Sequence, residues 1–214
     1  MVRTRGPATI IPEQTLLAAY RSGRFPMADS REDDEIFWVD PPLRGILPLD
    51  AFHIPKRLAR TMRTNAFRIT VDAAFPQVML SCADTITPKR LNTWINPLIE
   101  RSYANLHANG YAHSIEVWNG TALVGGLYGV SIGAAFFGES MFSHETDASK
   151  VALAHLAERL KAGGYMLLDT QFITDHLKQF GAVEIPRARY KELLAKAVVA
   201  KADFYVLGGA GAAG

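Results

Sequence analysis

The second half of the chain alternates between two hydrophobic patterns, one typical of strands and one typical of helices. Short apolar runs bounded by turn residues predict strands at 67–71, 113–118, 123–130, 134–137, 165–168 and 182–185. Apolar positions at helical spacing predict helices at 72–83, 96–109, 148–162, 174–180 and 186–201. Asp72 is the expected N-cap of the first of these helices, and Asn119-Gly120 is the expected turn of a hairpin. This order of elements predicts an α/β fold with a mixed sheet.

The first third of the chain follows a different pattern, in which prolines interrupt the apolar runs. A helix is predicted at 12–22, with Pro12 near its start and Gly23 at its end. A short strand at 36–39 and a helix at 55–64 follow, and proline keeps any other strand of this region short.

This change of pattern near residue 64 predicts two domains. We expect a small N-terminal domain at 1–64 and a larger domain at 65–214. The last residues of the larger domain, 207–214, are glycine and alanine apart from Leu207, and we expect them to form a disordered tail.

The strand at 134–137, the helix after it and the next strand predict a right-handed crossover between two parallel strands. Open α/β sheets bind ligands beyond the carboxyl ends of their strands. Glu139, Asp169 and Gln171 follow these two strands, so we expect them to face one cleft. Two other interpretations remain open, in which Asp169 caps the next helix and Glu139 is a surface charge.

Composition and charge exclude several classes of protein. Apolar residues make up 49% of the 214 residues and charged residues 21%, which excludes a disordered or fibrous chain. No apolar run reaches the length of a membrane span, and the first residues do not form a signal peptide, so a soluble cytosolic protein is expected. The single cysteine, Cys82, excludes an internal disulfide and is expected to be buried. The net charge of +2 does not by itself indicate a nucleic-acid partner.

The motifs of common catalytic and metal sites are missing. The six histidines form no metal-ligand spacing, and no nucleophile elbow, P-loop or dinucleotide fingerprint is present, so no metal and no cofactor are expected. The predicted crossover is similar to that of the acyl-CoA N-acetyltransferase fold, which grips a pyrophosphate with a glycine-rich turn before the crossover helix. Here 143–150 contains no glycine and two acids, Glu145 and Asp147, which disfavours binding of acyl-CoA.

Two segments of the predicted sheet are distinctive: Val-Gly-Gly-Leu-Tyr-Gly at 124–129 and Glu-Ser-Met-Phe-Ser at 139–143. Further characteristic segments lie at 23–27, 37–41, 44–49, 52–55, 92–95, 112–118, 147–150, 167–172 and 177–186. Together they resemble the leucyl/phenylalanyl-tRNA–protein transferase family over about residues 12–200.

The resemblance implies a fold, an activity and a set of site residues. The 65–214 domain is expected to be similar to N-acetyltransferases (GNAT-like). The enzyme is expected to move leucine or phenylalanine, and methionine less well, from aminoacyl-tRNA to proteins with N-terminal arginine or lysine, marking them for N-end rule degradation in the cytoplasm. By motif position, the catalytic pair falls on Asp169 and Gln171. The aminoacyl and terminal-adenosine site falls on Trp38, Trp94, Leu127, Phe136, Glu139, Ser140 and Met141.

The residue types suit this chemistry. An aminoacyl ester is already activated, so its transfer needs positioning of the amine and not a covalent nucleophile. We expect Gln171 to orient the amine, and Asp169 either to receive its proton or to polarise Gln171. Glu139 is expected to bind either the aminoacyl ammonium or the cationic side chain of the acceptor.

Other residues are expected to bind the tRNA and the aminoacyl side chain. A slot of Leu127, Phe136 and Met141 favours apolar side chains that are not branched at Cβ, and Trp38 and Trp94 can stack on adenine. Three basic residues on one helix face can hold acceptor-stem phosphates: Lys56, Arg60 and Arg63. A monomer is expected. Two alternatives stay open: an acyl-CoA-dependent N-acyltransferase, and a non-catalytic tRNA-binding module.

Overall fold

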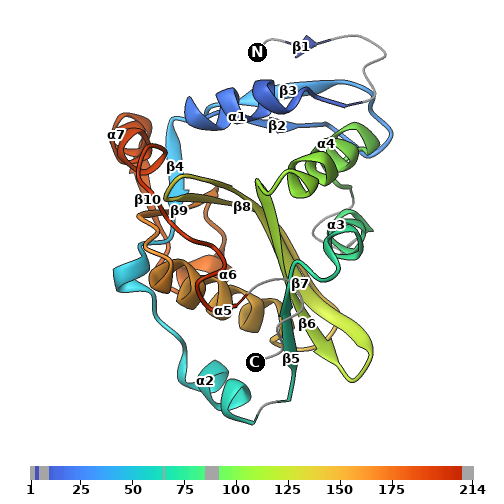
Figure 1. Cartoon of the computed structure of the whole chain (residues 1–214), viewed down its shortest axis with the longest axis vertical. Helices are drawn as coiled ribbons and strands as arrows, with labels where there is room; N and C mark the ends of the chain where they lie inside the picture. Colours follow the sequence, from blue (N-terminus) through green and yellow to red (C-terminus); the bar gives the residue numbers. More distant parts are fainter. Residues whose placement is uncertain (1–2, 5–9, 65, 85–91, 209–214) are drawn as a thin grey trace.

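A seven-stranded mixed sheet forms the centre of the molecule (Figure 1). The computed structural model describes residues 3–4, 10–64, 66–84 and 92–208. The strand order is β10-β4-β9-β8-β7-β6-β5. The strands are β4 (Leu43–Ile46), β5 (Arg68–Val71), β6 (Ala112–Asn119), β7 (Ala122–Ile132), β8 (Ala135–Ser143), β9 (Leu167–Gln171) and β10 (Val183–Pro186). Only β8 and β9 pair in parallel; the other described pairs of this sheet are antiparallel. The predicted α/β fold with a mixed sheet is confirmed.

Two strands extend further than their apolar runs predicted. The prediction ended one strand at residue 137 and placed 138–143 in a loop, but β8 continues to Ser143 because it keeps pairing with β7. Likewise β9 starts at Leu167 and ends at Gln171, so Asp169 and Gln171 belong to the strand and not to the loop after it. Polar residues at these strand ends hid the extent of the strands.

Helices cover both faces of the sheet (Figure 1). The residues of α1, α3, α4 and α7 pack into one buried apolar cluster, and those of α2, α5 and α6 pack into a second. Their bounds are α1 (Glu13–Arg21), α2 (Lys56–Arg63), α3 (Phe75–Asp84), α4 (Pro97–Ala108), α5 (Ala148–Ala162), α6 (Asp175–Lys178) and α7 (Arg187–Ala197), with a 3-10 turn, η1 (Leu49–Ala51). Within the described residues, no helix combines the length and the apolar character that a membrane span requires.

The predicted N-cap at Asp72 is wrong. The helix starts at Phe75, and Asp72 adopts a left-handed φ of 55° just after β5. Its carboxylate accepts hydrogen bonds from the backbone N–H of Ser114, at 2.7 Å, and from Tyr205 Oη, at 2.6 Å. Contacts across the sheet therefore determine the conformation of Asp72, and the helix begins three residues later.

The crossover β8–α5–β9 has the predicted order and the predicted parallel pairing, with Phe136 opposite Leu168 and Phe137 opposite Asp169. Helix α5 lies close to β7 because Gly125 has no side chain: a Cβ there would lie 2.5 Å from that of Ala148. Beyond the paired residues, β8 continues toward Ser143 along β7 while β9 ends at Gln171. A space therefore opens between β8, β9 and α5.

The N-terminal part of the chain forms a separate small sheet in the order β1-β3-β2. It contains β1 (Arg3–Thr4), β2 (Phe25–Met27) and β3 (Ile36–Val39), and α1 packs beside it. Strand β4, also from the first 64 residues, pairs with β9 and β10 of the large sheet. The domain boundary near residue 64 stays a prediction.

The C-terminal segment is described as far as Gly208, and the rest of the expected tail lies outside the described residues. Arg159 of α5 donates to the carbonyl oxygens of Phe204, at 2.7 Å, and Gly208, at 3.0 Å. This segment therefore lies against α5 up to residue 208.

Candidate active site

A cavity of about 250 Å³ lies between the diverging strands β8 and β9 and the helices α5 and α6. Most of its wall is apolar, and the polar residues come from β7, the middle of β8, the end of β9 and the start of α6. Its apolar lining residues include Leu127, Met141, Leu153, Leu156, Leu168 and Leu177. Thr170 Oγ1 and His176 Nε2 are buried on this wall and have no hydrogen-bond partner among the described residues. The cavity is thus a mainly apolar pocket with a few polar atoms available to a ligand.

A β-bulge turns Glu139 toward this cavity. Tyr128 pairs with Ser140 and Gly129 pairs with Gly138, so Glu139 is the extra residue of β8. In a regular strand, odd-numbered and even-numbered residues point to opposite faces of the sheet. Phe137 and Phe142 nevertheless pack in the same apolar cluster, so the bulge reverses this alternation between them. Bulges of this kind redirect a side chain next to a functional site.

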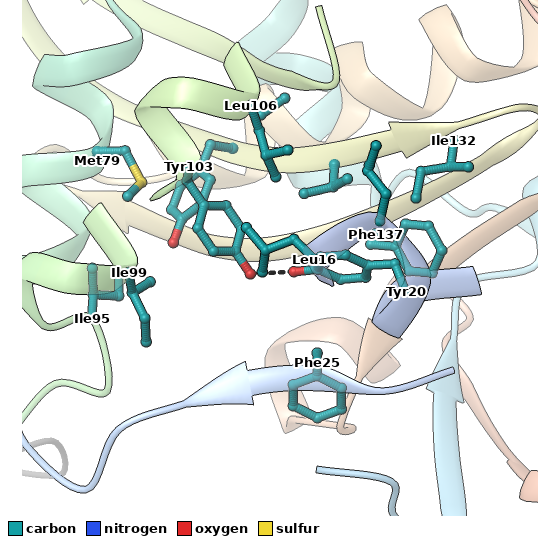
Figure 2. Close-up of a cluster of buried hydrophobic side chains, with 14 of the residues drawn as sticks. Leu16, Tyr20, Phe25, Met79, Ile95, Ile99, Tyr103, Leu106, Ile132 and Phe137 are labelled. Carbon is teal, nitrogen blue, oxygen red and sulfur yellow. Dashed lines mark hydrogen bonds between the residues drawn. The ribbon is translucent and has the colours of Figure 1, made fainter. Parts of the chain in front are cut away.

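Two buried tyrosines hold the Glu139 carboxylate. Tyr20 Oη of α1 donates to Glu139 Oε1 at 2.8 Å, and Tyr103 Oη of α4 lies 3.3 Å from Oε2. Figure 2 shows the two hydroxyls pointing toward one another from their two helices, joined by a hydrogen bond. Burial raises the pKa of Glu139 to about 8, although the tyrosine hydrogen bonds act in the opposite direction. Glu139 is therefore a carboxyl group that changes charge close to neutral pH.

Asp169 lies behind the cavity wall, fully buried and fully bonded. Arg44 Nη2 donates to Asp169 Oδ2 at 2.6 Å and Arg44 Nε to Oδ1 at 2.9 Å, which makes a bidentate ion pair. Tyr190 Oη donates to Oδ2 at 2.6 Å. Asp169 is not among the described residues that line the cavity. Its contacts are those of a group that holds its neighbours in place.

Gln171 is the residue of the cavity wall that is hydrogen-bonded to Asp169. The backbone N–H of Gln171 donates to Asp169 Oδ1 at 2.8 Å, and Gln171 Nε2 donates to Glu139 Oε1 at 3.2 Å. Its φ of 54° lies in the left-handed region, which costs a non-glycine residue energy. The turn is closed by Phe172 N–H donating to the carbonyl oxygen of Thr170 at 2.6 Å. Strained backbone of this kind concentrates at functional sites.

The structure brings together five of the nine expected catalytic and aminoacyl-site residues on the cavity wall. These are Leu127, Glu139, Ser140, Met141 and Gln171. The other four lie elsewhere. Asp169 is behind the wall, and Phe136 is fully buried and stacked on Phe204 with 5.7 Å between ring centroids. Trp38 lines a separate groove beside α1, and Trp94 is half-buried against the first apolar cluster.

The expected phosphate-binding residues form an exposed basic face on α2. Lys56, Arg60 and Arg63 are exposed, while Leu58 of the same helix is buried against the second apolar cluster. Helix α2 packs on α5, the helix that also borders the cavity. The basic face and the cavity are therefore connected through one helix.

Cys82 is fully buried in α3, as expected, and it does not line the cavity. In the part of the chain that the structure describes, no group of three or more histidine, cysteine or acidic side chains is placed to hold a metal ion.

Sequence reasoning missed three polar residues behind the site, Arg44, Tyr20 and Tyr103. Each lies far along the chain from the carboxylate that it contacts. It also missed the part of the cavity wall that α5 contributes, Leu153 and Leu156. The crossover pattern carried a usable signal for the leucines, because the helix between two parallel strands must cover the space between them.

Two family models match the chain. Residues 46–195 match the model of leucyl/phenylalanyl-tRNA protein transferase, and residues 13–42 match the model of its N-terminal domain.

Proteins named leucyl/phenylalanyl-tRNA–protein transferase are similar over nearly the whole chain. Those of Caulobacter vibrioides (strain NA1000 / CB15N) and Phenylobacterium zucineum are each 60% identical, over 93% and 91% of this chain and 91% and 88% of their own. The protein of Nitrobacter winogradskyi is 56% identical over 97% of this chain and 91% of its own. The chain therefore belongs to the leucyl/phenylalanyl-tRNA–protein transferase family, as its sequence motifs predicted.

Proposed function

We propose that this protein transfers leucine or phenylalanine, and methionine less well, from aminoacyl-tRNA to the α-amino group of proteins with N-terminal arginine or lysine. The names of its relatives support the reaction class. The observation that carries the proposal is the cavity itself, which is apolar inside and has Glu139 and Gln171 on its wall. The transfer marks the acceptor protein for degradation by the N-end rule, and the expected compartment is the cytoplasm.

The aminoacyl side chain occupies the leucine-lined part of the cavity. Burying a leucine or phenylalanine side chain contributes about 1.5–3 kcal/mol. A polar side chain would lose its hydrogen bonds to water there, and Thr170 and His176 could replace few of them. Side chains branched at Cβ have few rotamers and fit a narrow slot poorly. The cavity thus explains a preference for leucine, phenylalanine and methionine.

The chemistry is the attack of an amine on an ester. The acceptor nitrogen bonds to the ester carbonyl carbon, the bond to the ribose oxygen breaks, and the proton lost by the nitrogen finally resides on that oxygen. Because Gln171 Nε2 faces Glu139, the amide oxygen of Gln171 is left to accept a hydrogen bond from the amine. Holding the two reactants in this geometry lowers the barrier by about 7–11 kcal/mol.

Of the two roles that the sequence left open for Asp169, the contacts favour the one that acts through Gln171. Both carboxylate oxygens are engaged by Arg44, Tyr190 and the Gln171 backbone, and the side chain is inaccessible. An amine in the cavity cannot reach it without displacing these partners.

Both expected roles of Glu139 fit its place beside Gln171. With a pKa of about 8, most of Glu139 is neutral at pH 7 until a cation approaches. An ammonium group in the cavity favours the ionised form, so its binding lowers that pKa. The cation is either the aminoacyl ammonium or the side chain of the acceptor.

We further propose that the 65–214 domain has the N-acetyltransferase-like fold without its acyl-CoA site. The crossover β8–α5–β9 supports the first part. The start of α5 supports the second, because Asp147 is buried there and pairs with Lys150 at 2.8 Å. The N–H of Ser149 is also already bonded to Ser143 Oγ at 3.1 Å. A pyrophosphate would meet an acid and an occupied amide instead of a phosphate-binding loop.

We propose that the tRNA lies across α2 and reaches the cavity with its 3′ end. Lys56, Arg60 and Arg63 contact acceptor-stem phosphates without reading sequence. Trp38, in the groove beside α1, and Trp94, half-buried against the first apolar cluster, remain candidates for stacking on the terminal adenine. A monomer suffices for this arrangement.

The proposal is tested by transfer of labelled leucine from tRNA to a peptide that starts with arginine. Peptides that start with alanine or aspartate are the controls, and we expect transfer to the arginine peptide alone. Transfer to the aspartate peptide would assign a different acceptor class. Binding of charged tRNA without any product would identify a non-catalytic module, and activity only with acetyl-CoA would overturn the reaction class.

A further inference from the structure

Arg44 is a buried charged side chain with many partners near the cavity, although it does not line the described cavity wall. It is 1% exposed in the centre of β4, between β9 and β10. Besides its bidentate pair with Asp169, its Nη1 donates to the carbonyl oxygen of Gly23 at 2.9 Å. Its guanidinium lies between two aromatic rings, with Cζ 4.6 Å from the centroid of Phe25 and 4.5 Å from that of Tyr190. Hydrogen bonds and ring contacts together therefore hold the orientation of this cation.

The contacts of Arg44 lead to Gln171 in two steps. Arg44 and Tyr190 fix the Asp169 carboxylate, and Asp169 Oδ1 accepts the backbone N–H of Gln171. That hydrogen bond holds Gln171 at a φ of 54°, a conformation it would otherwise leave. Gln171 then reaches Glu139 with its side chain.

The pairing of β4 with β9 reinforces this chain of contacts. Gly45, next to Arg44, pairs with Gln171, whereas Ile46 pairs with Asp169, so the register shifts where the turn forms. A Cβ on Gly45 would lie 2.8 Å from the backbone carbon of Phe172, so only glycine allows β4 to approach so closely. Position 44 therefore adjoins the part of β4 that packs against the strained turn.

We propose that Arg44 is a positioning residue for the transfer reaction: by holding Asp169 it fixes the backbone of Gln171 and aims the Gln171 amide at the acceptor amine. This rests on the proposed function. Arg44 does not line the described cavity, so we expect it to act without touching the substrate. Lysine at this position would keep the positive charge but has no planar fork, so it cannot hold both carboxylate oxygens and the Gly23 carbonyl together.

The first test follows the hydrogen bond itself. In Arg44→Lys we expect the Gln171 backbone amide to exchange with solvent at least about tenfold faster by NMR, while amides in the centre of β7 keep their rates. Arg159→Lys is the matched control, because Arg159 is also a buried arginine that binds carbonyl oxygens, but those of Phe204 and Gly208. Unchanged exchange at Gln171 in Arg44→Lys, or equal acceleration throughout the sheet, would overturn the proposal.

The second test measures turnover in two backgrounds. Arg44→Lys should lower kcat on the order of 10²-fold, the effect of displacing a reacting group by about 1 Å, with the KM for leucyl-tRNA within about twofold. In Gln171→Ala the same substitution should change kcat less than about twofold, because the group it positions is gone.

An equal fold-loss in both backgrounds would show that Arg44 acts on the fold and not through Gln171. If Gln171→Ala turns over too slowly to measure, the hydrogen-exchange result alone decides. A wild-type protein that transfers no leucine would refute the proposed function, whereas an active wild type with additive losses refutes only the role of Arg44.

Discussion

Glu139 and Gln171 combine two features that stable folds usually avoid, a carboxyl group in a low-dielectric site and a non-glycine residue in the left-handed region. Tyr20 and Tyr103 partly compensate the first, and Asp169 compensates the second. Both features lie on the wall of the same cavity. Two such destabilising features are expected side by side where the geometry of a site is required for a reaction and not for stability.

The raised pKa of Glu139 gives the first prediction. Between its unfolded pKa near 4.3 and its folded pKa of about 8, the folded protein binds more protons than the unfolded chain. Glu139 therefore lowers stability as pH rises through this window, by at most about 1.4 kcal/mol per pH unit. Glu139→Gln removes this dependence, so its Tm relative to wild type should increase from pH 5 to pH 8. A difference in Tm that stays constant across these pH values would contradict the assignment.

The backbone of Gln171 gives the second prediction. Gln171→Gly and Gln171→Ala both remove the amide side chain, and we expect each to lower kcat on the order of 10²-fold. Only glycine relaxes the left-handed φ, so Gln171→Gly should be more stable than Gln171→Ala by about 1 kcal/mol in chemical denaturation. If the alanine variant were the more stable one, the φ of 54° would not be strained.

Particular residues show how far the sequence could predict this site. The closeness of Glu139 and Gln171 was predictable, because a crossover between parallel strands brings the segments that follow the last parallel pair, Phe137 and Asp169, side by side. The bulge at Glu139 was not, since it depends on the pairing partner that each residue finds in β7. Arg44 was not predictable either, because the partner that makes it a buried cation lies 125 residues away.

At the scale of elements, α5 has two functions, since it connects the parallel strands and forms one wall of the cavity. Its leucines divide along the helix: Leu156 lines the cavity, whereas Leu160, one turn later, is buried in the second apolar cluster without lining it. The start of the helix pairs Asp147 with Arg57 of α2 at 3.6 Å. We therefore expect the proposed selection of the amino acid and the proposed binding of tRNA to be separable, because they depend on two neighbouring helices.

Enlarging the cavity from α5 should change amino-acid preference. Leu156→Ala widens the slot, and we expect the ratio of kcat/KM for phenylalanyl-tRNA to that for leucyl-tRNA to rise about tenfold. Leu160→Ala is the matched control, because it removes an equally buried leucine from the same helix at a similar cost of about 2–5 kcal/mol. A similar change of ratio in both variants would mean that the cavity does not select the side chain.

The basic face of α2 should act on tRNA without selecting among tRNAs. Replacing Lys56, Arg60 and Arg63 together by alanine should raise the KM for leucyl- and phenylalanyl-tRNA equally. The slope of log affinity against log salt should fall by up to about 2–3, since each phosphate that a cation neutralises adds about 0.7–0.9 to it. Arg189→Ala, on the exposed surface of α7, is the control. Selective loss of one tRNA would show that α2 reads sequence.

At the scale of the whole molecule, contacts between segments that are distant in sequence stabilise the fold on both sides of the sheet. On one side Arg44 links the carbonyl of Gly23 to Asp169 in β9. On the other side the C-terminal segment reaches the residue that follows β5: Tyr205 Oη donates to Asp72, which also pairs with His113 at 2.7 Å. The first set of contacts reaches the site through Gln171, whereas the residues of the second do not line the described cavity, so we expect the second set to be independent of the site.

This independence gives the last prediction. Burial alone would raise the pKa of Asp72, but the hydrogen bonds from His113 and Tyr205 lower it below its ordinary value. A carboxylate whose pKa is lowered on folding stabilises the protein above its unfolded pKa, near 3.9, and loses this contribution as pH falls through the folded pKa. Tyr205→Phe removes one of these hydrogen bonds, so it should cost about 1 kcal/mol at pH 7.

That cost should shrink in acid, while kcat for leucine transfer stays at the wild-type value, because no contact of Tyr205 reaches the described cavity wall. Denaturation of both proteins at pH 7 and below pH 4, together with a transfer assay, checks both statements. A loss of kcat without a loss of stability would mean that the C-terminal segment communicates with the cavity, and the division of the molecule into two independent sets of contacts would then be wrong.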